Sequence, residues 1–381
     1  MFKKSILAVS LALGAVATVQ AVPFHFFGVS PTAEKVNFRA YLSVHGLYEE
    51  SARMGKTADG GYESGFNVDT EASMLGVNGR VQAADDFDFI YNVDYGLDFH
   101  THDSTMGVNK SGIVHRNQWL GLDSKQYGQL RMGRDDAFHF YVNTIGAERF
   151  FSTYGAGKFI HKNNRYHGNV ATYFTPMMSG FKLGAQYFGA KDNHGGGQDY
   201  YVNEEGSKVD QNGAAALVYY NYGGINLAAS YDYRVEGSDG VRVGGNYTAN
   251  GARIGFTWSQ FDQRVLKSEV ATLGTSELQD LDTWAASVEY FFTPEWRVYA
   301  QYGHANNGYW TSLPAHGIKR PELFGVEVDQ YNLALERKFS NRTAISPEIT
   351  YYQFGDRNGY GMATNLDDEL FIGVRLNLIL M

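Results

Sequence analysis

Short segments in which apolar and polar residues alternate recur along most of this chain. Residues 36–49 place apolar side chains at even positions, whereas residues 88–99 and 225–234 place them at odd positions. A period of two sends successive side chains to opposite faces of a β-strand. We therefore expect an all-β chain whose strands each have one apolar and one polar face.

The segment near the C-terminus indicates what each face contacts. Its even positions form an apolar row made of Leu370, Ile372, Val374, Leu376, Leu378 and Leu380. Arg375 and Asn377 lie on the opposite face. A soluble β-sandwich would bring Arg375 into its core, where an unpaired charge is costly. In a membrane barrel the same residue faces a water-filled interior and the apolar row faces lipid, so the segment favours a transmembrane β-barrel.

The connections between these segments are tight on one side and long on the other. The tight ones, rich in Gly, Asn, Asp and Pro, lie at 84–86, 123–128, 176–180, 222–224, 249–251, 293–295 and 340–342. The long ones lie at about 50–67, 100–113, 135–165, 190–212, 263–281, 305–328 and 355–367, with a short exception at 236–240. Seven tight turns and eight outer connections predict 16 antiparallel strands.

The first 21 residues have the pattern of a secretory signal. Lys3 and Lys4 precede an apolar run from Ile6 to Val19, and Val19-Gln-Ala21 resembles a cleavage site. We expect residues 1–21 to be a signal peptide, 22–35 an N-terminal periplasmic tail and 36–381 the transmembrane barrel.

The composition is compatible with a secreted β-barrel. The chain has no cysteine, and a closed barrel can do without disulfides because each strand edge is paired. It carries 41 acidic and 32 basic side chains, which argues against a nucleic-acid partner.

One long connection stands out because strands flank it on both sides. Residues 129–134 and 169–174 each have strand character, and the roughly 30 residues between them have neither a helical nor a strand period. A connection of that length in a compact fold is usually functional. We expect residues 135–165 to fold into the barrel and narrow it. Aromatic residues of this loop, such as Phe138 and Tyr141, would either pack it against the wall or form a stacking path for sugars.

Four short motifs, taken in order, resemble the general (diffusion) porins of Gram-negative outer membranes. They are Arg116-Asn-Gln-Trp-Leu-Gly-Leu122, Gln129-Leu-Arg-Met-Gly-Arg134, Asn169-Val-Ala-Thr-Tyr-Phe174 and Ser346-Pro-Glu-Ile-Thr-Tyr351. The ordered resemblance covers residues 36–381. It departs at Ala147-Glu-Arg-Phe150, where the family's constriction loop often has Pro-Glu-Phe-Gly.

The resemblance implies a 16-stranded antiparallel transmembrane β-barrel with an infolded constriction loop. Such a protein is a passive outer-membrane channel for small hydrophilic solutes and ions, without a catalytic step or cofactor. The implied partners are outer-membrane lipid and lipopolysaccharide, the barrel-assembly machinery and two further copies of the chain in a homotrimer.

In this family wall arginines face acidic residues on the loop, and the opposed charges set up a field across the pore. The wall candidates here are Arg39, Arg80, Arg116, Arg131 and Arg165, and the loop candidates are Asp135, Asp136 and Glu148. Strand parity turns Arg39 and Arg80 inward, whereas the motifs place Arg116 and Arg165. Each of these side chains could instead be a lumen charge away from the narrowest point.

Several alternatives remain at this stage. The same barrel could be selective for oligosaccharides or an anion. A more distant possibility is an outer-membrane β-barrel hydrolase, but the chain lacks a Gly-x-Ser-x-Gly motif. The acidic balance and the inward acids favour cations, whereas the arginines favour anions. His100 and His102 have no third metal ligand marked by spacing, so we expect no metal site there.

Overall fold

The computed structural model describes residues 35–50, 64–69, 73–97, 113–147, 167–189, 212–235, 238–262, 280–308, 326–357 and 368–379. The predicted signal peptide (1–21) and nearly all of the predicted tail (22–35) lie outside these ranges, so both stay predictions. Among the described residues, no helix is both long and apolar enough to cross a membrane.

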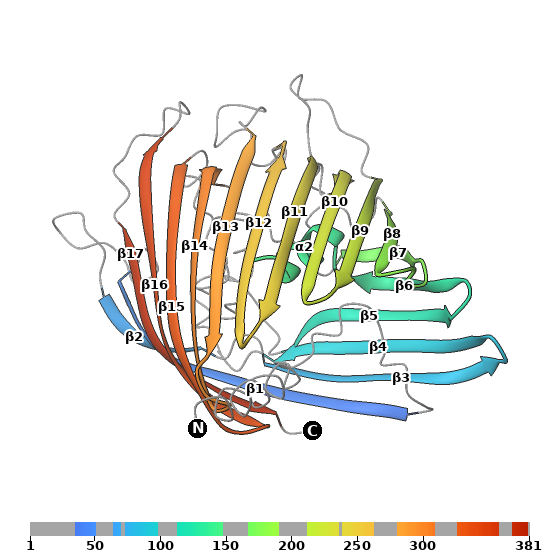
Figure 1. Cartoon of the computed structure of the whole chain (residues 1–381), viewed down its shortest axis with the longest axis horizontal. Helices are drawn as coiled ribbons and strands as arrows, with labels where there is room; N and C mark the ends of the chain where they lie inside the picture. The colour runs from blue at the N-terminus through green and yellow to red at the C-terminus, as the bar shows by residue number, and fades with distance from the viewer. Residues whose placement is uncertain are drawn as a thin grey trace, which may run out of the picture.

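The described chain forms one antiparallel sheet and a short helix, as the alternating pattern predicts (Figure 1). The strands are β1 (Lys35–Glu50), β2 (Ser64–Asp69), β3 (Met74–Ala84), β4 (Phe87–Leu97), β5 (Ile113–Ser124), β6 (Gly128–Asp135), β7 (His167–Phe174), β8 (Phe181–Phe188), β9 (Gly213–Tyr222), β10 (Ile225–Val235), β11 (Ser238–Ala249), β12 (Ala252–Phe261), β13 (Leu281–Phe291), β14 (Trp296–Gly308), β15 (Val326–Ser340), β16 (Thr343–Arg357) and β17 (Glu369–Ile379). The helix is α2 (Phe138–Ile145).

These labelled strands make a 16-stranded barrel because β2 and β3 are two parts of one strand. Both pair with β1: Asp69 lies opposite His45, and Met74 lies opposite Tyr41. Ser73 stands between the two parts, and its hydroxyl accepts a hydrogen bond from the Ser43 backbone N–H at 3.0 Å. The predicted strand count is therefore confirmed.

The barrel closes where the first strand meets the last. β1 pairs with β17 over ten positions, from Tyr41 opposite Ile379 to Glu50 opposite Leu370. The other edge of β1 pairs with β2 and β3, so β1 has a partner on each side. Among the strands that the structure describes, closure leaves no open sheet edge to present unpaired backbone groups to lipid.

All seven predicted tight turns join consecutive strands, and antiparallel alternation places them at one end of the barrel. In the turn between β11 and β12, Asn250 and Gly251 have φ of 50° and 75°. Positive φ at both central residues matches the right-handed strand twist, and Asn-Gly adopts it readily. The Asn-Gly pair found in the sequence therefore fixes the tight turn, and with it the pairing register, of the β11–β12 hairpin.

The two faces of the wall follow strand parity. In β17, Val374 is 46 % exposed on the outer face, whereas Arg375 is 2 % exposed and points inward. Exposed Leu333 and buried Asn332 repeat the pattern on β15. An apolar outer skin around a polar interior is the arrangement that lipid outside and water inside require.

Candidate pore constriction

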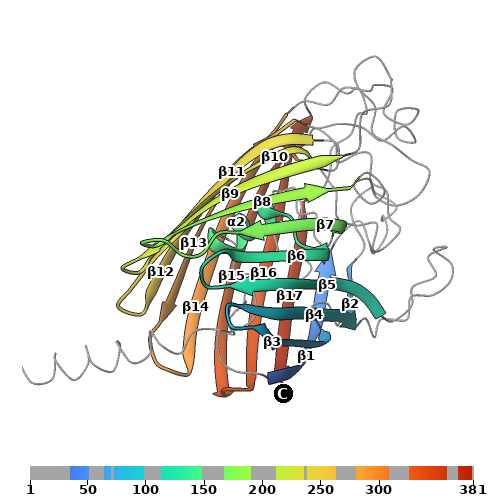
Figure 2. The same cartoon turned by 90° about the vertical axis from the view of Figure 1, so that its right-hand side faces the viewer.

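The loop after β6 turns inward, as the sequence analysis predicts. Its first part forms α2, which lies within the ring of strands and packs on β10 and β11 (Figures 1 and 2). All eight α2 residues are buried. The described part of the loop ends at Ala147, so the remainder up to residue 165 stays a prediction.

The sequence analysis found no helical period in this stretch, and burial explains why. A helical period arises when one side of a helix faces water. Helix α2 has the β6–β8 side of the wall on one flank and β10–β12 on the other, so its side chains are enclosed all round. Phe138 contacts Phe174 of β7, His139 lies at Asp232 of β10, and Val142 packs against Gly244 of β11.

The start of the loop is fixed by a buried ion pair. The Arg131 guanidinium lies 3.3 Å from the Asp135 carboxylate, which also accepts hydrogen bonds from the Tyr141 hydroxyl at 3.1 Å and the Thr172 hydroxyl at 3.0 Å. Burial, followed by the negative charge of Asp135, raises the pKa of Tyr141 well above its usual value. The Tyr141 hydroxyl therefore keeps its proton and remains a donor to Asp135.

Aromatic rings enclose this ion pair. The Arg131 guanidinium stacks on Trp119 and Phe174, each 4.8 Å from the ring centre. Phe138 contacts Phe174 at a centroid distance of 5.4 Å. The aromatic residues at the beginning of the loop therefore pack it against the wall, and Phe138 and Tyr141 are not placed as a stacking path for sugars.

A second buried pair joins the helix to the far wall. The Nδ1 atom of His139 on α2 lies 2.6 Å from an Asp232 carboxylate oxygen on β10. The Arg242 side chain of β11 donates a hydrogen bond to the His139 carbonyl at 3.0 Å. His139, Asp232 and Arg242 are each at most 1 % exposed. Hydrogen bonds to charged groups contribute more than neutral ones, about 1.5–3 kcal/mol each, so this contact holds α2 firmly.

The C-terminal end of α2 is capped by side chains of the wall. Arg253 on β12 donates to the carbonyl oxygens of Ile145 and Gly146, at 2.7 and 3.0 Å, and Asn246 on β11 donates to Ile145 at 2.7 Å. A helix leaves its last carbonyl groups without partners, and a cation there also complements the helix dipole. The wall thus supplies the donors that the helix end needs.

Glycines on the wall make room for this close approach. A Cβ atom at Gly244 would lie 2.8 Å from the Val142 carbonyl oxygen, and one at Gly255 would lie 2.4 Å from the Gly146 carbonyl oxygen. Real Cβ atoms are not found so close to backbone oxygen atoms. The backbone of α2 can therefore rest directly on β11 and β12.

Of the predicted wall arginines, Arg39 and Arg80 both point inward and both meet carboxylates. Arg39 lies 2.7 Å from Asp94, and its side chain is 31 % exposed, so it faces the open lumen. Arg80 lies 3.2 Å from Asp88 and also pairs with Asp123, close to the tight-turn end of the barrel. The structure therefore places these two arginines at different heights on the wall.

The other predicted residues fall into three groups. Arg116 is half-buried on β5, and beside it Asn117 donates to Asp136 of the loop at 2.9 Å. Arg131 and Asp135 are 3 % and 1 % exposed, so they lie beneath the loop and out of contact with water. Glu148 and Arg165 lie outside the described residues.

Sequence reasoning did not include the arginines of the opposite wall. Arg253 holds the helix end, and Arg297 lies between Glu289 and Glu336 at 2.5 and 2.8 Å. Arg375, expected to point inward, is fully enclosed 3.7 Å from Glu348. The sequence signal for these arginines is their place on the inward face of a strand. That place alone does not tell which arginine contacts the loop.

A closed 16-stranded barrel with an inward-folded loop and a charged lumen is the architecture of a porin channel. The model of the Gram-negative porin family matches residues 6–357, and the chain belongs to that family. It is therefore a non-enzymatic outer-membrane channel through which small solutes diffuse. No curated protein matches the chain.

Solved structures share the fold at low sequence identity. An anion-selective porin from Comamonas acidovorans is 15 % identical, with a TM-score of 0.66 over 91 % of this chain and 100 % of its own. The trimer form of OmpT from Vibrio cholerae is 17 % identical, with a TM-score of 0.61 over 91 % and 100 %. Salmonella typhi OmpF, in complex with daunomycin, is 15 % identical, with a TM-score of 0.59 over 92 % and 100 %.

Replacing Arg253 by Met should loosen the helix end. The variant loses two hydrogen bonds from a charged donor, each worth about 1.5–3 kcal/mol, while a side chain of similar length remains. In planar bilayers we expect R253M channels to show larger open-state current noise and more frequent closures at high voltage. Arg337→Met, on the outer face of β15, is the matched control. Equal noise in both variants would contradict the capping role.

Proposed function

We propose that this porin is a general diffusion channel that selects small hydrophilic solutes and ions mainly by size. The supporting observation is the pairing of opposite charges along the described lumen wall. Three arginines each contact a carboxylate. Arg39 with Asp94 and Arg80 with Asp88 lie at two heights of the β1–β4 wall, and Arg297 with Glu289 lies on β13 and β14. Charges arranged in this way orient polar solutes locally without presenting one uniform sign to a particular substrate.

We further propose a role at the constriction for each of the predicted residues. Arg39 and Arg80 with the half-buried Arg116 form the wall side, and Asp136 belongs to the loop side. Arg131 and Asp135 act from beneath by fixing the direction in which the loop leaves β6. Arg165 and Glu148 are assigned to the constriction by family resemblance alone.

Liposome swelling with a panel of sugars, amino acids and small anions tests the general-channel proposal. We expect the swelling rate to fall smoothly with solute size, whatever the solute class. Preferential passage of one class over others of equal size would replace this proposal by a substrate-selective channel. A barrel without reconstituted channel activity would contradict both.

An anion-selective channel is the second candidate. Arg253 donates to carbonyl oxygens, which carry no formal negative charge, so its own positive charge persists beside the loop. The similar fold of a porin described as anion-selective is consistent with this possibility but shows only the fold. The sign of the reversal potential across a salt gradient decides between the two candidates.

Neutralising Asp94 should shift that reversal potential towards anions. In Asp94→Asn the Arg39 guanidinium loses the carboxylate that lies 2.7 Å from it, and its field acts on passing ions within about 8 Å at physiological salt. Asp282→Asn, at a carboxylate bonded to Trp258 on the outer face, is the control and should leave the potential unchanged. An unchanged potential in D94N would show that this pair lies away from the selective region.

We also propose that the chain works as a homotrimer inserted by the barrel-assembly machinery and surrounded by outer-membrane lipid and lipopolysaccharide. Family membership and the trimer form of OmpT support this assembly. Light scattering of the detergent-purified protein should give three times the chain mass; a monomer mass would contradict the trimer.

A further inference from the structure

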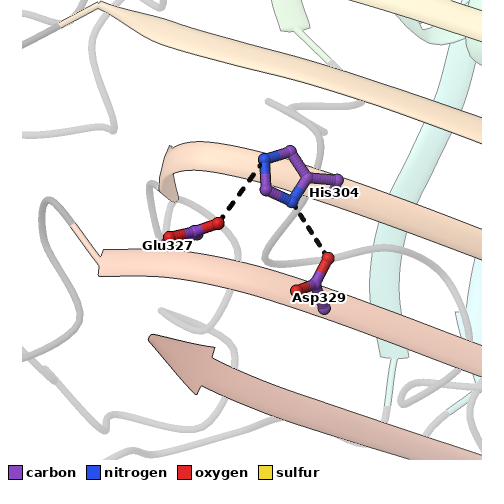
Figure 3. Close-up of side chains that lie close together, drawn as sticks. All are labelled: His304, Glu327 and Asp329. Atoms are coloured by element: carbon purple, nitrogen blue, oxygen red, sulfur yellow. Dashed lines mark hydrogen bonds and ion pairs between the residues drawn. The ribbon is translucent and has the colours of Figure 1, made fainter. Parts of the chain in front are cut away.

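Three side chains with metal-binding atoms converge on the outer face of the barrel. They are His304 on β14 with Glu327 and Asp329 on β15, and their ligand atoms all lie within 4.8 Å of one another (Figure 3). His304 and Asp329 are directly opposite in the β14–β15 register, and Glu327 is two residues along the same face. The cluster stands where both strands approach the connection at 309–325.

Strand parity shows that this cluster points away from the lumen. Tyr331 and Leu333, on the same face of β15 as Asp329, are exposed, whereas Gln330 between them is buried towards the interior. The His304 and Asp329 side chains are 18 % and 24 % exposed, and that of Glu327 is 49 % exposed. A dissolved ion can therefore reach the cluster from outside without entering the pore.

Asp329 holds the His304 ring in the orientation that metal-binding histidines adopt. Its Oδ1 atom lies 2.9 Å from Nδ1 of His304 and also accepts a hydrogen bond from the Tyr302 hydroxyl at 2.5 Å. A histidine that binds a metal through one nitrogen almost always donates its other N–H to a carboxylate, backbone carbonyl or water. With Nδ1–H directed at Asp329, the lone pair of His304 lies on Nε2.

The surroundings of Nε2 are rich in oxygen atoms. The Asn306 Oδ1 atom lies at hydrogen-bond distance, 3.2 Å from Nε2, and a Glu327 carboxylate oxygen lies 3.9 Å away. A metal ion on Nε2 would take the place of the hydrogen bond between Nε2 and Asn306. A metal ion with bonds of about 2.0–2.2 Å to nitrogen and oxygen can bridge the gap from Nε2 to Glu327. That gap is too long for a direct hydrogen bond.

We propose that His304 and Glu327 form a divalent metal site on the outer rim of the barrel, with Asp329 as the positioning residue. The ligand set indicates the class of metal. Imidazole nitrogen suits Zn²⁺ and similar transition metals, whereas Ca²⁺ and Mg²⁺ prefer oxygen ligands alone. With ligands on both β14 and β15, a bound ion links the two strands at the base of the 309–325 connection.

Calorimetric titration of the full-length, detergent-purified protein with Zn²⁺ tests this site. We expect His304→Ala to bind one Zn²⁺ fewer than the wild type and Glu327→Gln to bind that ion at least tenfold more weakly. Asp329→Asn keeps both ligands and should lose about 10–100-fold in affinity, as positioning carboxylates do. His115→Ala is the control, because His115 is also exposed on the outer face but its ring contacts Gln118.

Ca²⁺ titrated into the wild type should give no heat that depends on His304. The proposal is overturned if H304A binds Zn²⁺ with the wild-type stoichiometry and affinity, or if the wild type has no Zn²⁺ site that H304A lacks. Far-UV circular dichroism confirms folding of each variant, and if H304A does not fold, wild-type affinity in E327Q overturns the proposal by itself.

Discussion

Pairing of every strand edge is the constraint on which this structure depends. A backbone N–H or C=O facing hydrocarbon has no water to bond, and each unsatisfied group costs several kcal/mol. β1 meets this demand by pairing with β17 on one edge and with β2 and β3 on the other. Once the ring is closed, alternation along each strand assigns apolar side chains to lipid and polar ones to the lumen.

A closed ring creates an interior that the chain itself must line. Helix α2 enters this space with unbonded carbonyl groups at its C-terminal end and polar side chains along it, and the wall supplies partners for the groups named here. His139 meets Asp232, and Arg253 and Asn246 receive the final carbonyl groups. Gly244 and Gly255 leave the space that this contact needs. The loop narrows the pore, and hydrogen bonds hold it against wall strands that lie about a hundred residues further along the chain.

Much of the barrel could be predicted because strand parity and turn chemistry are local. The alternation in 88–99 and 370–380 places Asp94 and Arg375 inward, and Gly and Asn mark turns such as Asn250-Gly251. The break between β2 and β3 could not be predicted from the sequence. The Ser73 hydroxyl bonds the backbone N–H and C=O of Ser43, and these bonds form only after β1 has come to lie beside residue 73. An inward position also did not reveal whether an arginine meets water, as Arg39 does, or an aromatic enclosure, as Arg131 does.

The most direct test of this account is a cross-link between α2 and β10, in a chain that has no cysteine of its own. The His139 and Asp232 side chains meet at 2.6 Å across this contact, so thiols at the two positions can be bridged by a short bifunctional thiol reagent. The folded H139C/D232C variant should therefore cross-link. H139C/Y233C should not, because Tyr233 lies on the outer face of β10 and is 43 % exposed. Absence of the first cross-link, or equal formation of both, would contradict the placement of the helix inside the pore.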